Sequence, residues 1–289
     1  MPDPPFQSII GVPFIELQTV DSTNNYALQQ IKRASPDGIV KRKGRAMVAN
    51  HDGVPHGLAI FAHQQISGKG QRGKKWESAN GLNMALSIVI MPATLRISQQ
   101  FWLSACVSLA VTDLFKKYAG HDTKIKWPND LYWKDRKAGG ILIESGVGSR
   151  ESGVRRREAA VRNQDAGGGE WLWAIIGIGI NVNQTSFPAE LPNPVSLKQI
   201  TGKDFNPVNL AKELCELLNH RFEELIQNGF GNIYTEYLSR LYKRNEKVKL
   251  KKGNRVFEAI IKGVSPEGKL VVQHVIEEEF DFGSIEWTL

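Results

Sequence analysis

The segment that most limits the architecture of this chain is residues 99–118, QQFWLSACVSLAVTDLFKKY. Apolar side chains fall on nearly every side of a helix drawn through it, which predicts a helix covered all round by other elements. Its polar residues interrupt the apolar run, and no run in the chain approaches the ~20 apolar residues that a membrane span needs. With 289 residues, the chain is long enough for a core that encloses such a helix.

Expected strands and helices alternate up to residue 244, and the type of expected element then changes. Strands are expected at 12–20, twice within 40–65, and at 82–90, 125–133, 139–145 and 171–183; helices are expected at 24–33, 207–228 and 232–244. After Asn245 short strands follow one another with turn signals, which is typical of a small all-β module. We therefore predict a larger domain at 1–244 and a smaller one at 245–289. Residues 148–170 are rich in arginine and glycine and show no periodic pattern of apolar residues, which predicts a mobile surface loop.

The charge balance is basic, with 37 Lys and Arg against 30 Asp and Glu and a net charge of +7. Such a balance suits an anionic partner, which means a nucleic acid, a phosphate-bearing ligand or an acidic protein. It also serves simply to keep a surface soluble. An arginine-rich RNA-binding segment at 148–170 is one form of the first alternative.

Cysteine and histidine usage narrows the class of protein further. The two cysteines, Cys106 and Cys215, both lie in helical apolar patterns, which excludes a disulfide scaffold and a cysteine-rich zinc site. The six histidines lack the spacing of metal ligands, so no metal site is expected. The N-terminus carries acid and proline where a secretory signal carries lysine and an apolar stretch. These features predict a protein of a reducing compartment, the cytoplasm, without a membrane partner.

The loop GKGQRGKKW at 68–76 imitates two nucleotide-binding motifs. Gly68, Gly70 and Gly73 have the spacing of the dinucleotide fingerprint, and the run from Gly68 to Lys74 nearly matches a phosphate loop. Both motifs need a helix that opens at the loop, whereas this loop leads into another strand. In addition, Lys75 stands where a phosphate loop has the serine or threonine that binds Mg²⁺. We therefore reject both assignments.

The physical character of the loop nevertheless points to an anionic ligand. Glycines let the backbone approach a ligand closely and turn its amides inward. Four cations lie within seven residues: Lys69, Arg72, Lys74 and Lys75. Such a loop suits a polyphosphate or a pyrophosphate leaving group. The alternative is an exposed flexible turn, although Trp76 directly after it favours stacking on a flat ring.

Two further clusters carry polar residues at the ends of apolar strands. In KWPNDLYWKDRKAGGILIE at 126–144, a hairpin would bring Asp130 and Lys137 to similar heights. The carboxylate would then keep Lys137 charged and oriented; the alternative is a surface ion pair that contributes under ~1 kcal/mol. In IGIGINVN at 176–183, small residues and amides end a buried strand. The alternative there is a strand packed tightly against a helix.

Taken in this order, the three clusters resemble those of the biotin–protein ligases. DSTN at 21–24 and the small β-module also fit, so that the resemblance extends over residues 13–289. It implies an α+β fold with a mixed β-sheet flanked by helices and a small SH3-like barrel at the C-terminus. It also implies an ATP-dependent ligase that converts biotin and MgATP to biotinyl-5′-AMP and pyrophosphate. The biotinyl group then passes to one lysine of a carboxylase biotin carrier domain.

The resemblance implies roles for particular residues. Biotin would be bound by Ser22, Thr23, Asn24, Gln65, Lys69, Gly70, Gln71, Lys137 and Gly140, and ATP by Gly68, Arg72, Lys74, Trp76, Lys126, Asn129 and Asn181. Lys137, Lys69 and Asp130 would be catalytic. Lys69 would hold the biotin carboxylate and the α-phosphate, while Lys137 would stabilise charge that grows there during adenylation. Asp130 would orient Lys137 or the incoming lysine.

Two departures from the family pattern matter. Gln71 replaces an arginine that the family usually has in the loop, which predicts weaker retention of the adenylate. Only about a dozen residues precede the first expected strand, and we therefore expect a monofunctional ligase without a DNA-binding domain and without a nucleic-acid partner. A homodimer is compatible with the family.

Two other functions stay open at this point. One is a lipoate–protein ligase, which shares the fold and the adenylation chemistry, although the KWPND segment disfavours it. The other is a basic nucleic-acid-binding module that ends in an SH3-like barrel. The second alternative predicts salt-dependent RNA binding without ATP.

Overall fold

The larger part of the protein is built on a mixed seven-stranded sheet. The computed structural model describes residues 9–34, 56–92, 94–148 and 170–288. The strands are β1 (Phe14–Val20), β2 (Ala59–Gln65), β3 (Met84–Ile90), β4 (Thr123–Lys126), β5 (Asp130–Trp133), β6 (Arg136–Gly148) and β7 (Glu170–Ile180). They lie in the order β1-β2-β3-β7-β6-β5-β4. β1 and β2 are parallel, and the other neighbours are antiparallel. This confirms the expected mixed sheet.

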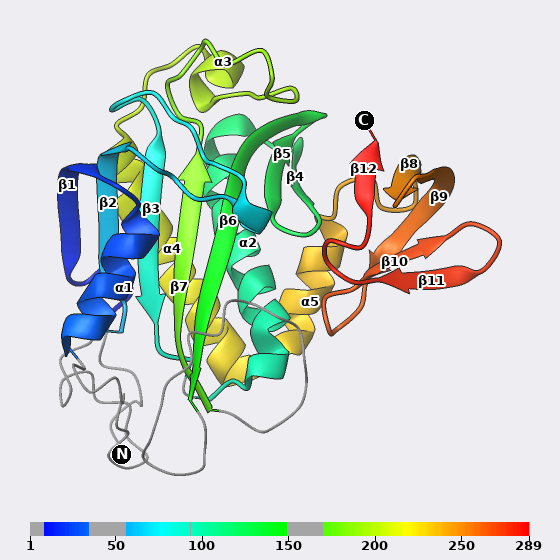
Figure 1. Ribbon diagram of the computed structural model, residues 1–289, viewed down its shortest axis with the longest axis horizontal. Coiled ribbons are helices and arrows are strands. Elements are labelled where there is room, and N and C mark those ends of the chain that lie inside the picture. The colour runs from blue at the N-terminus through cyan, green and yellow to red at the C-terminus, as the bar shows by residue number, and fades with distance from the viewer. Residues whose placement is uncertain (1–8, 35–55, 93, 149–169, 289) are drawn as a thin grey trace.

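Helices cover both faces of the sheet (Figure 1). α1 (Thr23–Ala34) packs on one face, where Ala27 and Ile31 meet Ile60, Val89 and Ile175. The other face is covered by α2 (Gln100–Ala119), α4 (Pro207–Asn228) and α5 (Phe230–Ser239), while the short α3 (Leu197–Thr201) follows the end of β7. The helix expected at 207–228 is confirmed as α4, and its N-cap Asn206 accepts from the backbone of Val208 and Asn209.

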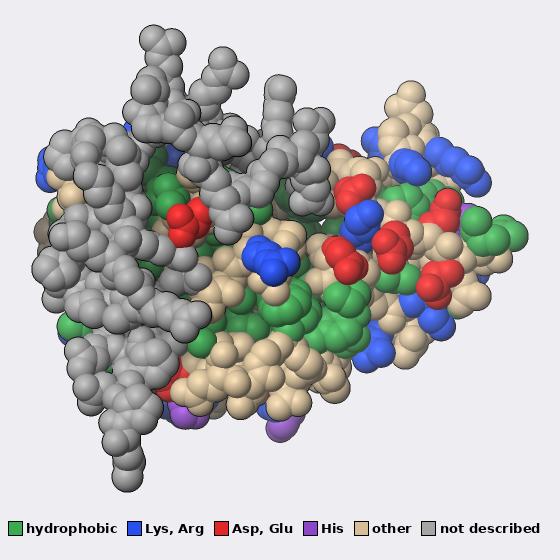
Figure 2. All heavy atoms as spheres, turned by 90° about the horizontal axis from the view of Figure 1, so that it is seen from below, with side chains coloured by type: hydrophobic (Ala, Val, Ile, Leu, Met, Phe, Trp, Pro, Cys, Tyr) green, Lys and Arg blue, Asp and Glu red, His purple; other side chains and the backbone are tan. Residues whose placement is uncertain are grey.

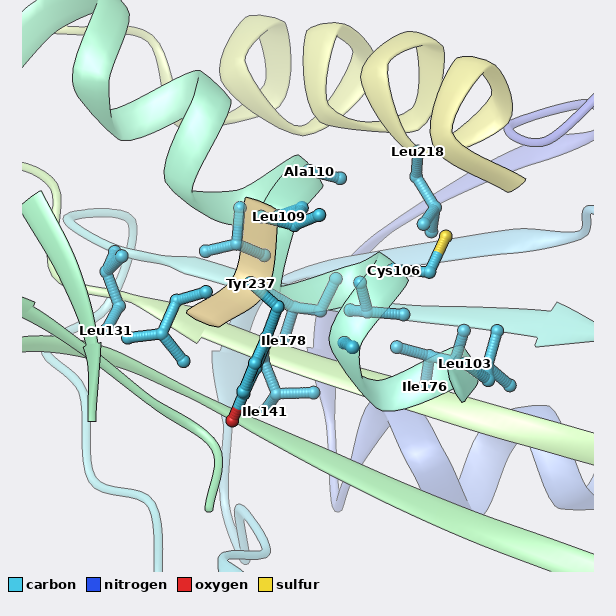
Figure 3. Close-up of a cluster of buried hydrophobic side chains, with 14 of the residues drawn as sticks. Leu103, Cys106, Leu109, Ala110, Leu131, Ile141, Ile176, Ile178, Leu218 and Tyr237 are labelled. Carbon is cyan, nitrogen blue, oxygen red and sulfur yellow. The ribbon is translucent and has the colours of Figure 1, made fainter. Parts of the chain in front are cut away.

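α2 is buried as its sequence predicts. Figure 3 shows its side chains between the sheet and the two other helices, with Leu103, Cys106, Leu109 and Ala110 of α2 near Ile141, Ile176, Ile178, Leu218 and Tyr237. Both cysteines are buried thiols, and burial raises the pKa of Cys215 to about 12. Within the described ranges, no helix combines the length and the apolarity needed to cross a lipid bilayer.

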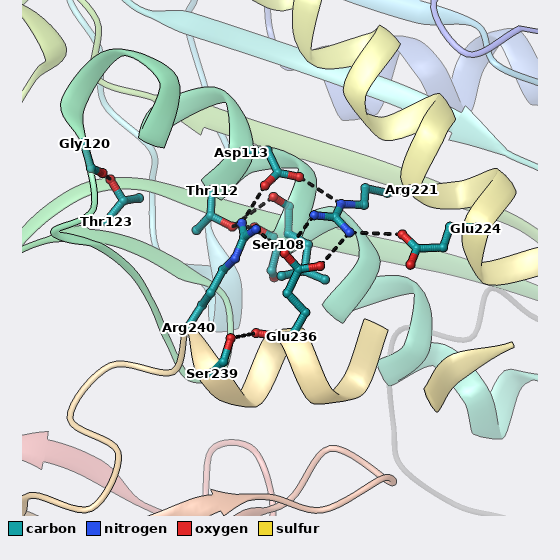
Figure 4. Close-up of polar contacts among 11 residues, drawn as sticks. Ser108, Thr112, Asp113, Gly120, Thr123, Arg221, Glu224, Glu236, Ser239 and Arg240 are labelled. Carbon is teal, nitrogen blue, oxygen red and sulfur yellow. Dashed lines mark hydrogen bonds and ion pairs between the residues drawn. The ribbon is translucent and has the colours of Figure 1, made fainter. Parts of the chain in front are cut away.

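An ion-pair cluster ties the three helices together at one place (Figure 4). Asp113 of α2 accepts from Arg221 of α4 at 2.8 Å and from Arg240 after α5 at 2.6 Å. Glu236 of α5 bonds both arginines. Because every charge has a partner of opposite sign, the cluster avoids the penalty of an unpaired buried ion.

The C-terminal residues form a separate sheet of five antiparallel strands. These are β8 (Lys247–Lys252), β9 (Arg255–Val264), β10 (Leu270–Gln273), β11 (Glu277–Phe280) and β12 (Glu286–Thr288), in the order β11-β10-β9-β8-β12. This agrees with the expected SH3-like module, which lies beside α5 in Figure 1. Trp127 donates to the backbone oxygen of Gly268 at 2.9 Å and thereby ties the module to the larger sheet. The division into domains at 244/245 stays a prediction.

The structure departs from the expected elements in three places. The strand expected at 125–133 is two strands, because residues 127–129 form the turn of a hairpin in which Lys126 of β4 pairs with Asp130 of β5. The helix expected at 232–244 starts earlier, at Phe230, and ends at Ser239, before the positive φ values of Lys243 and Asn245. Gly148 and Glu170 belong to strands rather than to the expected loop. Residues 149–169, and the first strand expected in 40–65, lie outside the described residues.

Candidate active site

A patch of small residues lies on one face of the large sheet. Gly179 of β7 lies opposite Ala85 of β3 on one side and Gly140 of β6 on the other. In the next row along β7, Gly177 lies opposite Ser87. Paired residues in antiparallel strands present their side chains on the same face. This face is therefore almost free of side chains just beyond the N-terminal end of α1.

The glycine loop folds over this patch as a hydrogen-bonded hairpin. The Gly70 amide donates to the Lys74 oxygen at 2.7 Å, and the Trp76 amide donates to the Gly68 oxygen at 2.9 Å. The turn needs positive φ at Arg72, 56°, and at Gly73, 74°. Apart from one short 3₁₀ turn at Gln71–Gly73, no helix opens within the loop, which confirms that it is neither a dinucleotide fingerprint nor a phosphate loop.

Trp76 lies flat on the glycine patch. A Cβ built on Gly179 would come within 2.4 Å of Cε2 of the Trp76 indole, so only glycine leaves room for the ring. The indole Nε1 is buried and, among the described residues, has no hydrogen-bond partner. A buried donor of this kind is costly unless an acceptor reaches it. The ring therefore combines a flat apolar surface with a donor for a ligand.

The β5–β6 hairpin brings Lys137 and Asp130 together, as the sequence predicts. Lys137 Nζ lies 2.7 Å from Asp130 Oδ1, and the two side chains are 31% and 24% exposed. A Cβ built on Gly140 would lie 3.4 Å from Asp130 Oδ1, 3.7 Å from Trp76 Cζ3 and 3.8 Å from Lys137 Cε. Gly140 thus marks the point where the ion pair and the indole meet. A cation held in this way, over a bare backbone, can stabilise an oxyanion.

Two asparagines fix the backbone around this ion pair. The Asn129 amide donates to the Ile141 oxygen, and the Asn181 amide donates to the Val195 oxygen at 3.1 Å. Val195 in turn donates its amide to the Lys137 oxygen at 2.8 Å. Both asparagines are buried. Their side chains hold the strand that carries Lys137, whereas their contacts with adenine and ribose stay predictions.

The polar residues at the start of α1 meet Gln65 at the end of β2, as expected. Ser22, Thr23 and Asn24 are 1%, 3% and 3% exposed. The Thr23 amide and hydroxyl both donate to Gln65 Oε1, at 2.9 and 3.1 Å. In the glycine loop, the Gln71 amide lies 3.4 Å from the Ile141 oxygen of β6, whereas Lys69 joins this group through Glu144.

The sequence analysis missed two members of this group. Ser87 of β3 is fully buried, lies 2.7 Å from Thr23 Oγ1, and also bonds Asn24 Oδ1. Glu144 of β6 accepts from Asn24 Nδ2 at 2.7 Å and from Lys69 Nζ at 3.3 Å. Ser87 is a lone hydroxyl in the apolar run MALSIVI, and Glu144 an acid that ends GILIE; these are the only signals. We call Thr23, Asn24, Gln65, Ser87 and Glu144 the head cluster.

Three other cations are assigned to ATP, and one of them, Lys126, pairs with Asp130 in the β4–β5 register. Arg72 and Lys74 are exposed at the tip of the loop. Lys126 lies in an aromatic cage, with Nζ 4.6 Å from the centre of the Tyr132 ring, 6.0 Å from that of Tyr242 and 5.2 Å from that of Trp287. Burial lowers the pKa of Lys126 to about 8. Their contacts with nucleotide therefore stay predictions.

Comparison with known proteins gives a consistent set of relatives. Residues 41–154 match the Biotin/lipoate A/B protein ligase family. The chain is 29% identical over 230 residues to the bifunctional ligase/repressor BirA of Bacillus spizizenii, which covers 78% of this chain and 64% of that protein. It is 27% identical over 224 residues to the biotin–[acetyl-CoA-carboxylase] ligase of Paracoccus denitrificans, with 74% and 83% covered.

The fold comparison extends over the whole chain. The biotin protein ligase of Aquifex aeolicus, solved in complex with biotin and ATP, matches with a TM-score of 0.68 at 22% identity, covering 98% of this chain and 100% of that one. Because the identity is low, this likeness shows the fold alone. The chain spans 64% of the length of the BirA relative.

Proposed function

We propose that this chain is a biotin–protein ligase, on the basis of its similarity to the biotin/lipoate A/B protein ligase family over residues 41–154 and to BirA of Bacillus spizizenii. It adenylates biotin with MgATP and transfers the biotinyl group to a lysine of a carboxylase carrier domain. The observation that carries this proposal is the Lys137–Asp130 pair, Nζ to Oδ1 2.7 Å, beside the bare Gly140 backbone and under the edge of Trp76.

In the first step the protein brings two anions together. A biotin carboxylate oxygen attacks the α-phosphorus of ATP; the new O–P bond forms as the bond to the bridging oxygen breaks, and pyrophosphate leaves. Lys137 screens the carboxylate as it approaches the phosphate and stabilises the negative charge that accumulates on the phosphoryl oxygens. Asp130 fixes the direction of this ammonium through their ion pair, Nζ to Oδ1 2.7 Å. No protein nucleophile takes part, because positioning and charge screening are sufficient.

In the second step the carrier lysine attacks the acyl carbon of biotinyl-5′-AMP. The C–N bond forms, the C–O bond to AMP breaks, and the amine loses its proton. The mixed anhydride must survive until the carrier arrives, which requires that water be excluded. The hairpin loop with Trp76 lies directly over the glycine patch and can serve as that cover.

The magnesium ion is part of the MgATP substrate in this proposal. Within the described part of the chain, no three or more His, Cys, Asp or Glu side chains gather as metal ligands. In this proposal phosphate oxygens supply the ion's main ligands. This arrangement is usual for Mg²⁺, which keeps several waters and binds through substrate phosphates.

The partner of the second step is a carrier domain rather than a nucleic acid. Figure 2 shows Lys and Arg side chains interspersed with Asp and Glu side chains over the C-terminal module, instead of a field of one sign. Pairs such as Lys247–Glu258, 2.9 Å, and Lys269–Asp281, 3.7 Å, belong to this pattern. A mixed surface gives little of the counterion release that drives nucleic-acid binding. A homodimer remains compatible with the proposal.

The decisive experiment combines the purified chain, biotin, MgATP and an isolated carrier domain, followed by mass spectrometry of that domain. We expect the mass to rise by one biotinyl group, and only when ATP is present. Lipoate in place of biotin should leave the carrier unmodified. A lipoyl adduct would make the chain a lipoate ligase, and no adduct with either acid would refute the proposal.

A further inference from the structure

The hydrogen-bond directions in the head cluster are set by one carboxylate. A carboxylate only accepts hydrogen bonds, so the amide nitrogen of Asn24, 2.7 Å from Glu144 Oε2, must be the donor. The Asn24 oxygen is thereby turned toward Ser87. A Cβ on Gly177 would lie 2.5 Å from that oxygen, so glycine at 177 is needed for this arrangement.

At the other end of the head cluster, Gln65 also presents a hydrogen-bond acceptor. Gln65 Oε1 receives the Thr23 backbone N–H at 2.9 Å, so its oxygen faces Thr23. Between these two acceptors lie only two hydroxyl groups, those of Ser87 and Thr23. The three contacts Asn24–Ser87, Ser87–Thr23 and Thr23–Gln65 therefore share two protons. One of the three contacts always lacks a proton.

This shortage of protons makes the cluster a site for an N–H donor. Ser87 is fully buried and Thr23 is 3% exposed, so water cannot easily supply the missing donor. An acceptor left without a donor in such surroundings is costly. A cyclic urea carries two N–H donors on one ring edge, whereas the dithiolane ring of a lipoyl group carries none.

We propose that Glu144 is a positioning residue that keeps the head cluster short of protons and so selects an acid whose ring bears ureido N–H groups. This inference rests on the proposed function and adds the source of its substrate specificity. Glu144 also bonds Lys69 Nζ at 3.3 Å, which places the cation assigned to the substrate carboxylate next to the same group.

The substitution Glu144→Gln tests the direction of the bonds without a change of shape. An amide can donate as well as accept, so Asn24 is free to turn over and present its nitrogen to Ser87. All three contacts then have a proton, and no acceptor is left without a donor for the ligand to satisfy. We expect the Kd of biotin, measured by calorimetry, to rise at least about tenfold. The kcat of ATP–pyrophosphate exchange at saturating biotin should fall by a smaller factor than the affinity, because Lys137 and Asp130 stay in place.

A second substitution should reverse this loss. Asn24→Asp alone places two carboxylates against each other and should also weaken biotin. In Asn24→Asp/Glu144→Gln the new amide donates to the new carboxylate, which can again only accept from Ser87. The double variant should therefore bind biotin within about threefold of the wild type. If it binds no better than the weaker single variant, or if Glu144→Gln leaves the Kd within twofold, the inference is wrong.

Two controls separate this inference from other causes of a loss. Glu213→Gln removes a carboxylate that likewise accepts from a lysine and a neutral donor, Lys117 and Tyr118, at 2.5 and 2.6 Å, but it lies between α2 and α4 and should leave the Kd unchanged. If the single variants do not fold, the wild type itself provides the test with biotin methylated on a ureido nitrogen. This analogue should bind at least about tenfold more weakly than biotin. Equal binding of the two compounds overturns the inference. Wild-type protein without biotin-dependent exchange refutes the proposed function instead.

Discussion

Lys137 and Asp130 face each other across the β5–β6 hairpin, with Nζ 2.7 Å from Oδ1. The two residues do not pair directly in the ladder, since the register shifts between Leu131 and Tyr132. The shift places Lys137 opposite Tyr132 and Asp130 opposite Gly140. The absence of a side chain at Gly140 leaves the space over which the ammonium reaches the carboxylate.

We expect Lys137→Ala to remove adenylation while biotin binding largely remains. The ammonium acts on charge that grows in the transition state, so its loss should lower the rate of ATP–pyrophosphate exchange by about 10²–10³-fold, the range found for a single oxyanion donor. Calorimetry with biotin should show a much smaller change in Kd. Full exchange activity in this variant would rule out the assigned role.

A matched control for this prediction lies in the same hairpin. Lys134 occupies the turn and is largely exposed, with Nζ 3.8 Å from Asp122 Oδ2 and 4.7 Å from the centre of the Trp133 ring. Lys134→Ala should leave the exchange rate within about twofold of the wild type. Equal losses in the two variants would indicate that the hairpin, rather than the Lys137 charge, had been disturbed.

The fold was predictable wherever its causes are local in sequence. The all-round apolar pattern of residues 99–118 predicts α2, and the helix expected at 207–228 is α4. The turn at residues 127–129 was not predictable, because the pattern of 125–133 does not reveal that Lys126 pairs back with Asp130. The early end of α5 also depends on a tertiary contact, since Arg240 and Tyr242 bond the backbone of Ile125 in β4.

The candidate site likewise contains contacts that local sequence predicts and contacts that it does not. Lys137 and Asp130 are joined by one short turn, so a hairpin alone brings them together. Asn24 and Glu144 are 120 residues apart in sequence, and their contact depends on α1 crossing the sheet at one position. Ser87 looks like a tolerated polar residue in an apolar strand until Thr23 and Asn24 are placed against it. Contacts of this kind require the tertiary structure.

Gly179→Ala should displace Trp76 and lower the stability of the protein. The added Cβ would lie 2.4–2.8 Å from three atoms of the indole, and overpacking of this kind costs about 1–3 kcal/mol. Urea unfolding should show this loss, and the KM for ATP should rise because the ring leaves its place. In the Trp76→Phe background the effect on KM should shrink.

The control for this substitution is a glycine with open space around it. Gly231 lies in α5, and a Cβ there would meet no atom within 4 Å. Because alanine is the better helix former, Gly231→Ala should stabilise the protein by about 0.5–1 kcal/mol. If Gly179→Ala proves as harmless as Gly231→Ala, the close approach of the indole to β7 is wrong.

Gln71→Arg should slow the release of the adenylate. Gln71 lies in the turn of the glycine loop and reaches only the backbone oxygen of Ile141, at 3.4 Å. An arginine would add a charge that can bond phosphate in two places. A stopped-flow chase of preformed biotinyl-5′-AMP should give a smaller dissociation rate for the variant. An unchanged rate would show that the identity of residue 71 does not control retention.

Lys126 should make the stability of the protein depend on alkaline pH. Burial lowers the pKa of Lys126 to about 8 from its ordinary value of 10.5. Between these two values the unfolded chain binds the proton more than the folded protein does, and the free energy of unfolding therefore rises with pH by about 1.4 kcal/mol per unit. Below pH 8 the lysine is charged in both states, and its contribution no longer changes.

The measurement compares the wild type with Lys126→Met in urea unfolding at pH 7 and pH 9.5. The wild type should gain about 2 kcal/mol over the variant between these values, at about 1.4 kcal/mol per unit of pH above the folded pKa. Burial raises the pKa of Tyr132. Its hydroxyl therefore stays neutral in the folded protein throughout this range and does not produce the same pH dependence. Parallel pH profiles of the two proteins would mean that the aromatic cage holds the ammonium without a penalty, through the attraction of the three ring faces.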